Sequence, residues 1–257
     1  MTTATSPLSR YINVLAFACT VIVNGLAGST TLLGGKVTAD ISDANPTLIT
    51  PAGYVFAIWG IIYILLGVFV GYQALPSQTA KEYHQKIGWL FVQSSLLNIV
   101  WLFLWQFEQL SLSVVVMFLL LATLIAIYVR LGIGKSAAPL REKLLVHLPF
   151  SVYLGWITIA AIANVAATLV SVNWDGFGVS QETWATLILI IALLIALAVI
   201  ATRKDVAYGL VITWAALGIA AKQSGYPDIV LIAQATATTT AIAVIAAFIL
   251  LARSRHK

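Results

Sequence analysis

Long uncharged stretches dominate the chain, and short polar segments separate them. Most stretches reach the roughly 20 residues that an α-helix needs to cross a hydrocarbon layer of about 30 Å. Such runs are too long for buried strands, and they lack the alternation of a membrane barrel. The pattern predicts an all-α, polytopic membrane helical bundle with eight transmembrane helices, of which the seventh is a little short: Tyr11–Leu33, Tyr54–Gln73, Ile87–Phe107, Leu110–Val129, Leu148–Val172, Thr183–Thr202, Val206–Ala221 and Ile229–Ala252.

Composition agrees with this interpretation. Hydrophobic residues make up 61% of the chain and charged residues only 9%, whereas soluble domains contain about 25% charged residues. The mean hydropathy is +0.98. The single cysteine, Cys19, lies inside the first predicted span, so it forms no disulfide within the chain and builds no metal site.

The positively charged residues fall mostly on one side of the membrane in the predicted topology. With eight helices, one side of the membrane collects twelve of the 14 Lys and Arg residues, and only Lys36 and Lys222 fall on the other. This bias predicts cytoplasmic termini and explains the basic pI without nucleic acid as a partner. A cleaved signal peptide ending near Ala27 is the alternative to a retained first helix. The twelve are Arg10, Lys81, Lys86, Arg130, Lys135, Arg141, Lys143, Arg203, Lys204, Arg253, Arg255 and Lys257.

Composition also changes along the chain. The first five predicted helices are rich in tryptophan, whereas the last three consist mainly of Ala, Leu, Ile, Val and Thr. The polar segment Ser171–Glu182 separates the two parts and has the Gly, Asn, Asp and Ser content of an external loop. We therefore predict a five-helix membrane unit over residues 1–172 and a three-helix membrane extension over residues 173–257.

The sequence lacks the residues that several kinds of function require. No ionisable side chain lies in the middle of a predicted span, which argues against a proton pump, a proton-coupled carrier and a hydrolase with paired carboxylates. The three histidines, His84, His147 and His256, fall in connections or the tail, and Lys222 lies at a helix end, so neither haem nor retinal ligation is indicated. Phosphate-loop and zinc motifs are also missing. We predict a protein that is not an enzyme and has no metal site.

Aromatic and amide side chains recur at helical spacing on three predicted helices. An aromatic wall with a few neutral polar groups suits a flat, largely apolar ligand. The alternative is structural, since Trp and Tyr also form interfacial belts and buried Asn also joins helices. For Tyr54, Trp89 and Trp105 the structural role is favoured, and Trp174 and Trp184 are expected to be interface anchors. The three sets are Phe56, Trp59 and Tyr63; Asn98, Trp101 and Trp105; and Trp156, Ala160 and Asn164.

Three segments resemble the TspO/MBR family of tryptophan-rich sensory or translocator proteins. "PAGYVFAIWGIIYILLG" (Pro51–Gly67) is similar to that family's second helix, "LNIVW" (Leu97–Trp101) to its third and "YLGWITIAAIAN" (Tyr153–Asn164) to its fifth. The resemblance covers about residues 11–172. It implies a five-helix bundle that binds porphyrins or other hydrophobic small molecules and often forms homodimers. It places these residues in the pocket: Trp59, Tyr63, Asn98, Trp101, Trp156, Ala160 and Asn164.

The leading hypothesis is an integral, multi-pass membrane protein that binds an aromatic or tetrapyrrole-like small molecule in sensing, buffering or transport. No bound cofactor is expected beyond a possible porphyrin or other tetrapyrrole as ligand. Expected partners are the lipid bilayer and the hydrophobic ligand, and the resemblance implies a second copy of the chain. Gly67 and Gly71 form a GxxxG pair, which is found at dimer faces, but close packing between helices of one chain is the favoured interpretation here. Two alternatives stay open: a carrier for a small solute, in which the last three helices move, and a structural subunit of a membrane assembly.

Overall fold

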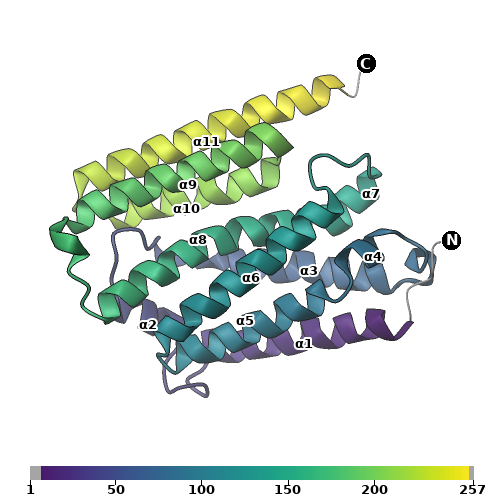
Figure 1. Ribbon diagram of the computed structural model, residues 1–257, viewed down its shortest axis with the longest axis horizontal. Coiled ribbons are helices and arrows are strands. Elements are labelled where there is room, and N and C mark those ends of the chain that lie inside the picture. Colours follow the sequence, from purple (N-terminus) through teal and green to yellow (C-terminus); the bar gives the residue numbers. More distant parts are fainter. Residues whose placement is uncertain (1–6, 255–257) are drawn as a thin grey trace. The chain divides into compact units, whose positions relative to one another are not determined.

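The computed structural model describes residues 7–254, and this part of the chain consists of helices and their connections, without a strand (Figure 1). Residues 1–6 and 255–257, including Arg255, His256 and Lys257 of the predicted cytoplasmic side, lie outside the described residues. Eight long helices account for most of residues 7–254: α1 (Pro7–Ser29), α3 (Ile58–Ala74), α5 (Leu90–Gln106), α6 (Leu110–Leu131), α8 (Leu148–Ser171), α9 (Gln181–Arg203), α10 (Val206–Lys222) and α11 (Pro227–Ser254).

Shorter helical segments connect the long ones. They are α2 (Thr38–Ala44), η1 (Gly53–Ala57), η2 (Pro76–Gln78), α4 (Tyr83–Ile87), α7 (Leu140–Glu142), η3 (Lys143–His147) and η4 (Gly176–Gly178). Local sequence explains several boundaries. Ser180 and Asp205 accept hydrogen bonds from the backbone N–H groups of Thr183 and Tyr208, which caps the starts of α9 and α10. Lys204, in the left-handed region, ends α9.

Each predicted transmembrane helix corresponds to one long helix. In the described part of the chain, six helical stretches are long and apolar enough to cross a membrane: Ser9–Ser29, Gly53–Ala74, Leu110–Leu131, Leu140–Ser171, Gln181–Arg203 and Pro227–Arg253. The protein is therefore an all-α, multi-pass membrane protein. α5 and α10 have 17 residues each, about 25 Å of helix. Their crossing, and hence the count of eight, stays a prediction.

Contacts divide the chain into two compact units. The first unit contains Met1–Ala44 and Trp59–Leu154, and the second contains Asn45–Ile58 and Gly155–Lys257. α8 begins in the first unit and ends in the second. The sequence-based division at residue 172 stays a prediction. The grouping by contact differs from it because both the segment before α3 and most of α8 belong to the unit of the C-terminal helices.

In the first unit, α5 packs against α1 and α6, and phenylalanine side chains fill the core. The rings of Phe69, Phe91 and Phe150, from three helices, lie 5.0 to 6.2 Å apart with edge-to-face geometry. Such pairs add to the stabilisation from burial alone. On α3, a β-carbon added at Gly67 would lie 3.2 Å from the ring of Phe17. Gly67 therefore lets α1 and α3 approach closely within one chain.

Polar side chains fasten the two ends of α1 to its neighbours in the first unit. Near the start, the Gln73 side-chain amide donates to the carbonyl of Arg10 at 3.0 Å. Near the end, the Gln106 amide donates to the carbonyls of Ala27, Leu33 and Lys36, at 2.9 to 3.4 Å. In an apolar surrounding, such bonds prevent the cost of unpaired backbone groups. Gln106 thereby holds the connection between α1 and α2.

In the second unit, α10 packs against both α9 and α11 (Figure 1). The Thr213 and Thr240 hydroxyls are 2.8 Å apart and link α10 to α11. η1 lies against α10, because the Ala52 N–H donates to the Gly218 carbonyl at 3.0 Å and the Trp214 indole donates to the Val55 carbonyl at 3.2 Å. The segment before α3 is thus bound to the C-terminal helices through backbone groups.

Candidate functional site

Four aromatic side chains from three helices form a cluster in the first unit. The rings of Trp59 and Tyr63, one turn apart on α3, are stacked with centroids at 5.6 Å and an interplanar angle of 18°. Trp101 of α5 lies nearly parallel to Trp59 at 6.4 Å, and Tyr153 of α8 meets Trp59 edge-on at 6.2 Å. We call these four residues the aromatic cluster. Three of its rings, those of Trp59, Tyr63 and Trp101, are nearly parallel, and flat apolar surfaces of this kind suit a planar ligand.

An amide network borders the aromatic cluster. Asn98 is fully buried, and its amide donates to the Tyr153 hydroxyl at 3.2 Å. Its carbonyl oxygen accepts from the amide of Asn24 at 2.7 Å, and Asn24 also donates to the Thr20 carbonyl on α1. The network ties α1, α5 and α8 together at the level of the rings and fixes which way the Asn98 amide faces.

The Tyr63 hydroxyl is the polar atom of the aromatic cluster that the protein does not satisfy. It is buried, and within the described residues it has no hydrogen-bond partner. Leaving such a group unpaired costs about 1 to 3 kcal/mol. A bound molecule with a polar atom at this point would remove that cost. The arrangement therefore suits a flat, largely apolar ligand that carries a polar group at one edge.

Four of the seven predicted site residues are therefore neighbours in one unit: Trp59, Tyr63, Asn98 and Trp101. The other three, Trp156, Ala160 and Asn164, lie on α8 in the second unit. There Trp156 is almost fully buried and meets Phe56 of η1 edge-on at 5.7 Å. Asn164 is buried two turns further along α8. Their part in ligand binding stays a prediction from the resemblance.

The remaining singled-out aromatics have visible structural contacts. Tyr54 is half exposed and its ring meets Trp214 at 5.3 Å. The Trp105 indole donates to the Thr38 carbonyl at 3.2 Å and so fastens α2 to α5. Trp89 is 62% exposed. The contacts fit the structural roles favoured for Tyr54 and Trp105, whereas the role of Trp89 stays a prediction.

Two residues of this site were not assigned from the sequence. Asn24 shares a helical face with Asn13 and Thr20, at spacings of eleven and four, which is a readable signal on an apolar span. Tyr153 stands within the quoted segment "YLGWITIAAIAN". Its direction depends on how α8 is rotated about its axis, and no local pattern supplied that rotation.

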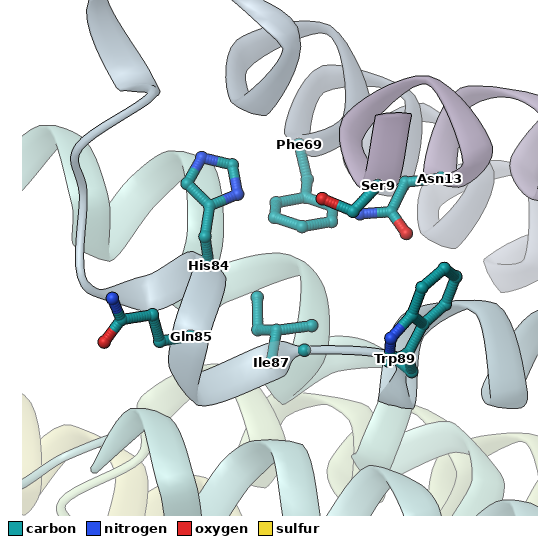
Figure 2. Close-up of a pocket in the computed structure, with 8 residues that line it drawn as sticks. Ser9, Asn13, Phe69, His84, Gln85, Ile87 and Trp89 are labelled. Carbon is teal, nitrogen blue, oxygen red and sulfur yellow. The ribbon is translucent and has the colours of Figure 1, made fainter. Parts of the chain in front are cut away.

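A separate pocket of about 270 Å³ lies near the start of α1 in the first unit. Figure 2 shows its side chains, which come from α1, α3, α4 and the residue that precedes α5. His84, on α4, is buried and its Nε2 atom has no hydrogen-bond partner among the described residues. Burial lowers the pKa of His84, and the nearby Arg10 charge lowers it further, against a hydrogen bond to the Gln78 backbone that raises it. The lining residues are Ser9, Asn13, Phe69, His84, Gln85, Ile87, Gly88 and Trp89.

The second unit contains a larger pocket of about 600 Å³, where α8 ends and α9 begins. None of the seven predicted site residues lines either pocket. No group of three or more His, Cys, Asp and Glu side chains in residues 7–254 has an arrangement suited to a metal ion. The chemistry offered by the predicted site is therefore that of indoles, phenols and amides, which bind molecules through stacking and neutral hydrogen bonds.

Apolar helices of membrane-spanning length, together with a cluster of rings and amides, define a polytopic helical membrane protein. The family model described as TSPO-like protein matches residues 10–251, which is nearly the whole chain. The chain belongs to this TSPO-like family. The match reaches beyond the range 11–172 in which the motifs were found and includes the last three helices. No curated protein and no solved structure gives a significant match.

Proposed function

We propose that this TSPO-like membrane protein binds a flat, largely apolar small molecule of the tetrapyrrole class at the aromatic cluster, without catalysing a reaction. Binding of this kind serves sensing, buffering or transport of the ligand. The observation that carries the proposal is the buried, unpaired Tyr63 hydroxyl beside the stacked Trp59 ring.

The chemistry of the cluster supports a neutral binding role. Indole and phenol rings provide dispersion contacts over a large area, and they lose little conformational freedom when a ligand packs on them. Asn98 is already held by Asn24 and Tyr153, so its orientation is set before a ligand arrives. The side chains of the cluster are uncharged, which suits a ligand whose central part is apolar.

Titration of the purified protein with protoporphyrin IX, followed by quenching of tryptophan fluorescence, tests the proposal. Tyr63→Phe should weaken binding by roughly two- to tenfold, the range for one neutral hydrogen bond. The same variant should raise the thermal midpoint of the ligand-free protein, because it removes a buried, unpaired hydroxyl. Trp59→Ala should abolish most of the quenching.

Two matched variants serve as controls. Tyr72→Phe removes a hydroxyl from the same helix, where Tyr72 stacks on Tyr83 outside the aromatic cluster, and Trp89→Ala removes an exposed indole. Both should leave porphyrin affinity unchanged. Porphyrin quenching that survives Trp59→Ala and Tyr63→Phe with unaltered affinity would exclude the aromatic cluster as the site.

A further inference from the structure

The pocket of the second unit has apolar walls and a polar rim. It lies between the end of α8, the start of α9 and the segment before η1. Its volume of about 600 Å³ is within the range of small-molecule sites, roughly 300 to 1,000 Å³. Half-buried Leu48, Val165, Leu169, Val170 and Ile188 form its walls.

Two indoles form the part of the wall nearest the connection between α8 and α9. The rings of Trp174 and Trp184 lie 5.3 Å apart at 52°. The Trp184 indole N–H donates to the Gly176 carbonyl at 3.0 Å. Since this donor is used within the connection, Trp184 offers the pocket its π-system rather than a hydrogen bond. Both tryptophans were expected to be interface anchors, and the structure shows that they also line a pocket.

The charge at the rim of the pocket is negative. Among the residues that line the pocket, Asp175 carries the one charge. Two exposed polar residues lie near it, Asn173 on the same connection and Gln181 at the start of α9. The Asp175 Oδ1 atom accepts the Phe177 N–H at 3.0 Å, which holds the carboxylate in place. A carboxylate beside two indoles attracts a cation, because both the negative charge and the ring faces favour positive charge.

We propose that this pocket is a second binding site, distinct from the aromatic cluster, and that it takes a hydrophobic organic cation. The apolar body of the ligand lies against Leu48, Val165 and Leu169. Its positive centre lies at the rim, against the Asp175 carboxylate and the indoles of Trp174 and Trp184. A ligand that carries carboxylates, as many porphyrins do, is repelled at this rim, so this pocket selects by charge, whereas the uncharged aromatic cluster does not.

Two probes of nearly equal size and shape but opposite charge test the proposal. Equilibrium dialysis of the purified protein in a non-ionic detergent, corrected for protein-free micelles, compares tetraphenylphosphonium with tetraphenylborate. We expect the cation to bind at least several-fold more tightly than the anion. Equal affinities, or tighter binding of the anion, would overturn the proposal.

Variants locate the binding. Asp175→Asn keeps an oxygen that accepts the Phe177 N–H, so it should preserve the loop and weaken tetraphenylphosphonium binding about two- to fivefold, as for one exposed charge pair. Val165→Trp should fill the pocket and reduce binding of the cation much further. The matched control is Glu182→Gln, which removes an exposed charge in the first turn of α9 outside the pocket lining.

The control variant distinguishes binding at this pocket from attraction by diffuse surface charge. If Glu182→Gln weakens cation binding as much as Asp175→Asn does, diffuse surface charge explains the preference and the proposed site is wrong. The proposed site is also wrong if Val165→Trp leaves binding of the cation unchanged while the circular dichroism spectrum and thermal midpoint of this variant match those of the parent protein. Asp175→Asn, Val165→Trp and Glu182→Gln all change residues outside the aromatic cluster, so each variant should bind protoporphyrin IX with the affinity of the parent protein.

Discussion

Asn98 joins two partners inside an apolar helix, because its carbonyl oxygen accepts from Asn24 and its amide donates to the Tyr153 hydroxyl. Its polar character within an apolar span marks it as a site candidate in the sequence. Periodicity could place Asn98 and Trp101 on one face of α5, because both lie on the same element. It could not name Tyr153 as partner, since contacts between helices depend on the rotation of each helix about its axis.

His84 should make stability depend on pH. The unfolded chain protonates this histidine near pH 6.5, whereas burial and the Arg10 charge lower its pKa in the folded protein. Protonation of His84 is therefore less favourable in the folded state than in the unfolded state. The resulting contribution to the free energy of unfolding is present above pH 6.5 and is lost as the pH falls toward the lowered pKa. Thermal unfolding in detergent, followed by circular dichroism, should give a lower midpoint at pH 5.5 than at pH 7.5.

The variant His84→Gln isolates this effect. Glutamine is uncharged at both pH values, so the difference in midpoint between pH 7.5 and pH 5.5 should shrink. A difference that stays as large in His84→Gln as in the parent would show that other groups cause the pH dependence.

At the scale of elements, sequence located the helices well, because membrane spans and caps are local signals. The predicted seventh span, Val206–Ala221, differs from α10 by one residue at its C-terminal end. The short η1 segment was not separated from the second span. It winds as a 3-10 helix where it packs on α10, through the bonds of Ala52 to Gly218 and of Trp214 to Val55. That contact joins segments far apart in sequence.

Gly218 should be essential for the packing of η1 on α10. A β-carbon there would collide with the Val55 side chain and would lie 3.1 Å from the β-carbon of Pro51. Gly218→Ala should therefore push η1 away and destabilise the protein by about 1 to 3 kcal/mol. Unfolding by sodium dodecyl sulfate in mixed micelles, followed by circular dichroism, measures the change.

Gly60 provides the matched control on another helix. A β-carbon at Gly60 of α3 meets nothing within 4 Å, so Gly60→Ala should be neutral or stabilise by about 0.5 to 1 kcal/mol through helix propensity. Equal effects of the two substitutions would contradict the close contact at Gly218.

At the scale of the whole molecule, the predicted count of eight crossings requires that α5 spans the membrane beside α1. Trp89, before α5, lines the same pocket as Asn13 near the start of α1. At the other end, Gln106 bonds to the Ala27 carbonyl, and Lys36 pairs with Glu108 at 2.5 Å. α5 therefore follows α1 over most of its length, although it has only 17 residues.

Eight crossings and cytoplasmic termini predict the sidedness of each connection. In a Cys19→Ser background, Gly225→Cys should react with a membrane-impermeant maleimide added to intact cells, and Lys135→Cys should react only after the membrane is opened. A β-carbon at Gly225 meets nothing within 4 Å, so the substitution is tolerated. Protection of the cysteine at position 225 in intact cells would show that α10 does not cross.

The sequence by itself determined that this protein is a polytopic helical membrane protein with TSPO-like motifs. Hydrophobic length, the distribution of charge along the chain and short motifs can be recognised without knowing which helices are neighbours. The tertiary structure decided which side chains meet: the packing of Trp59 on Trp101 and Tyr153, the unpaired Tyr63 hydroxyl, and the indole-lined pocket beside Asp175. Each of these depends on how helices are rotated and packed, which is a property of long-range contacts.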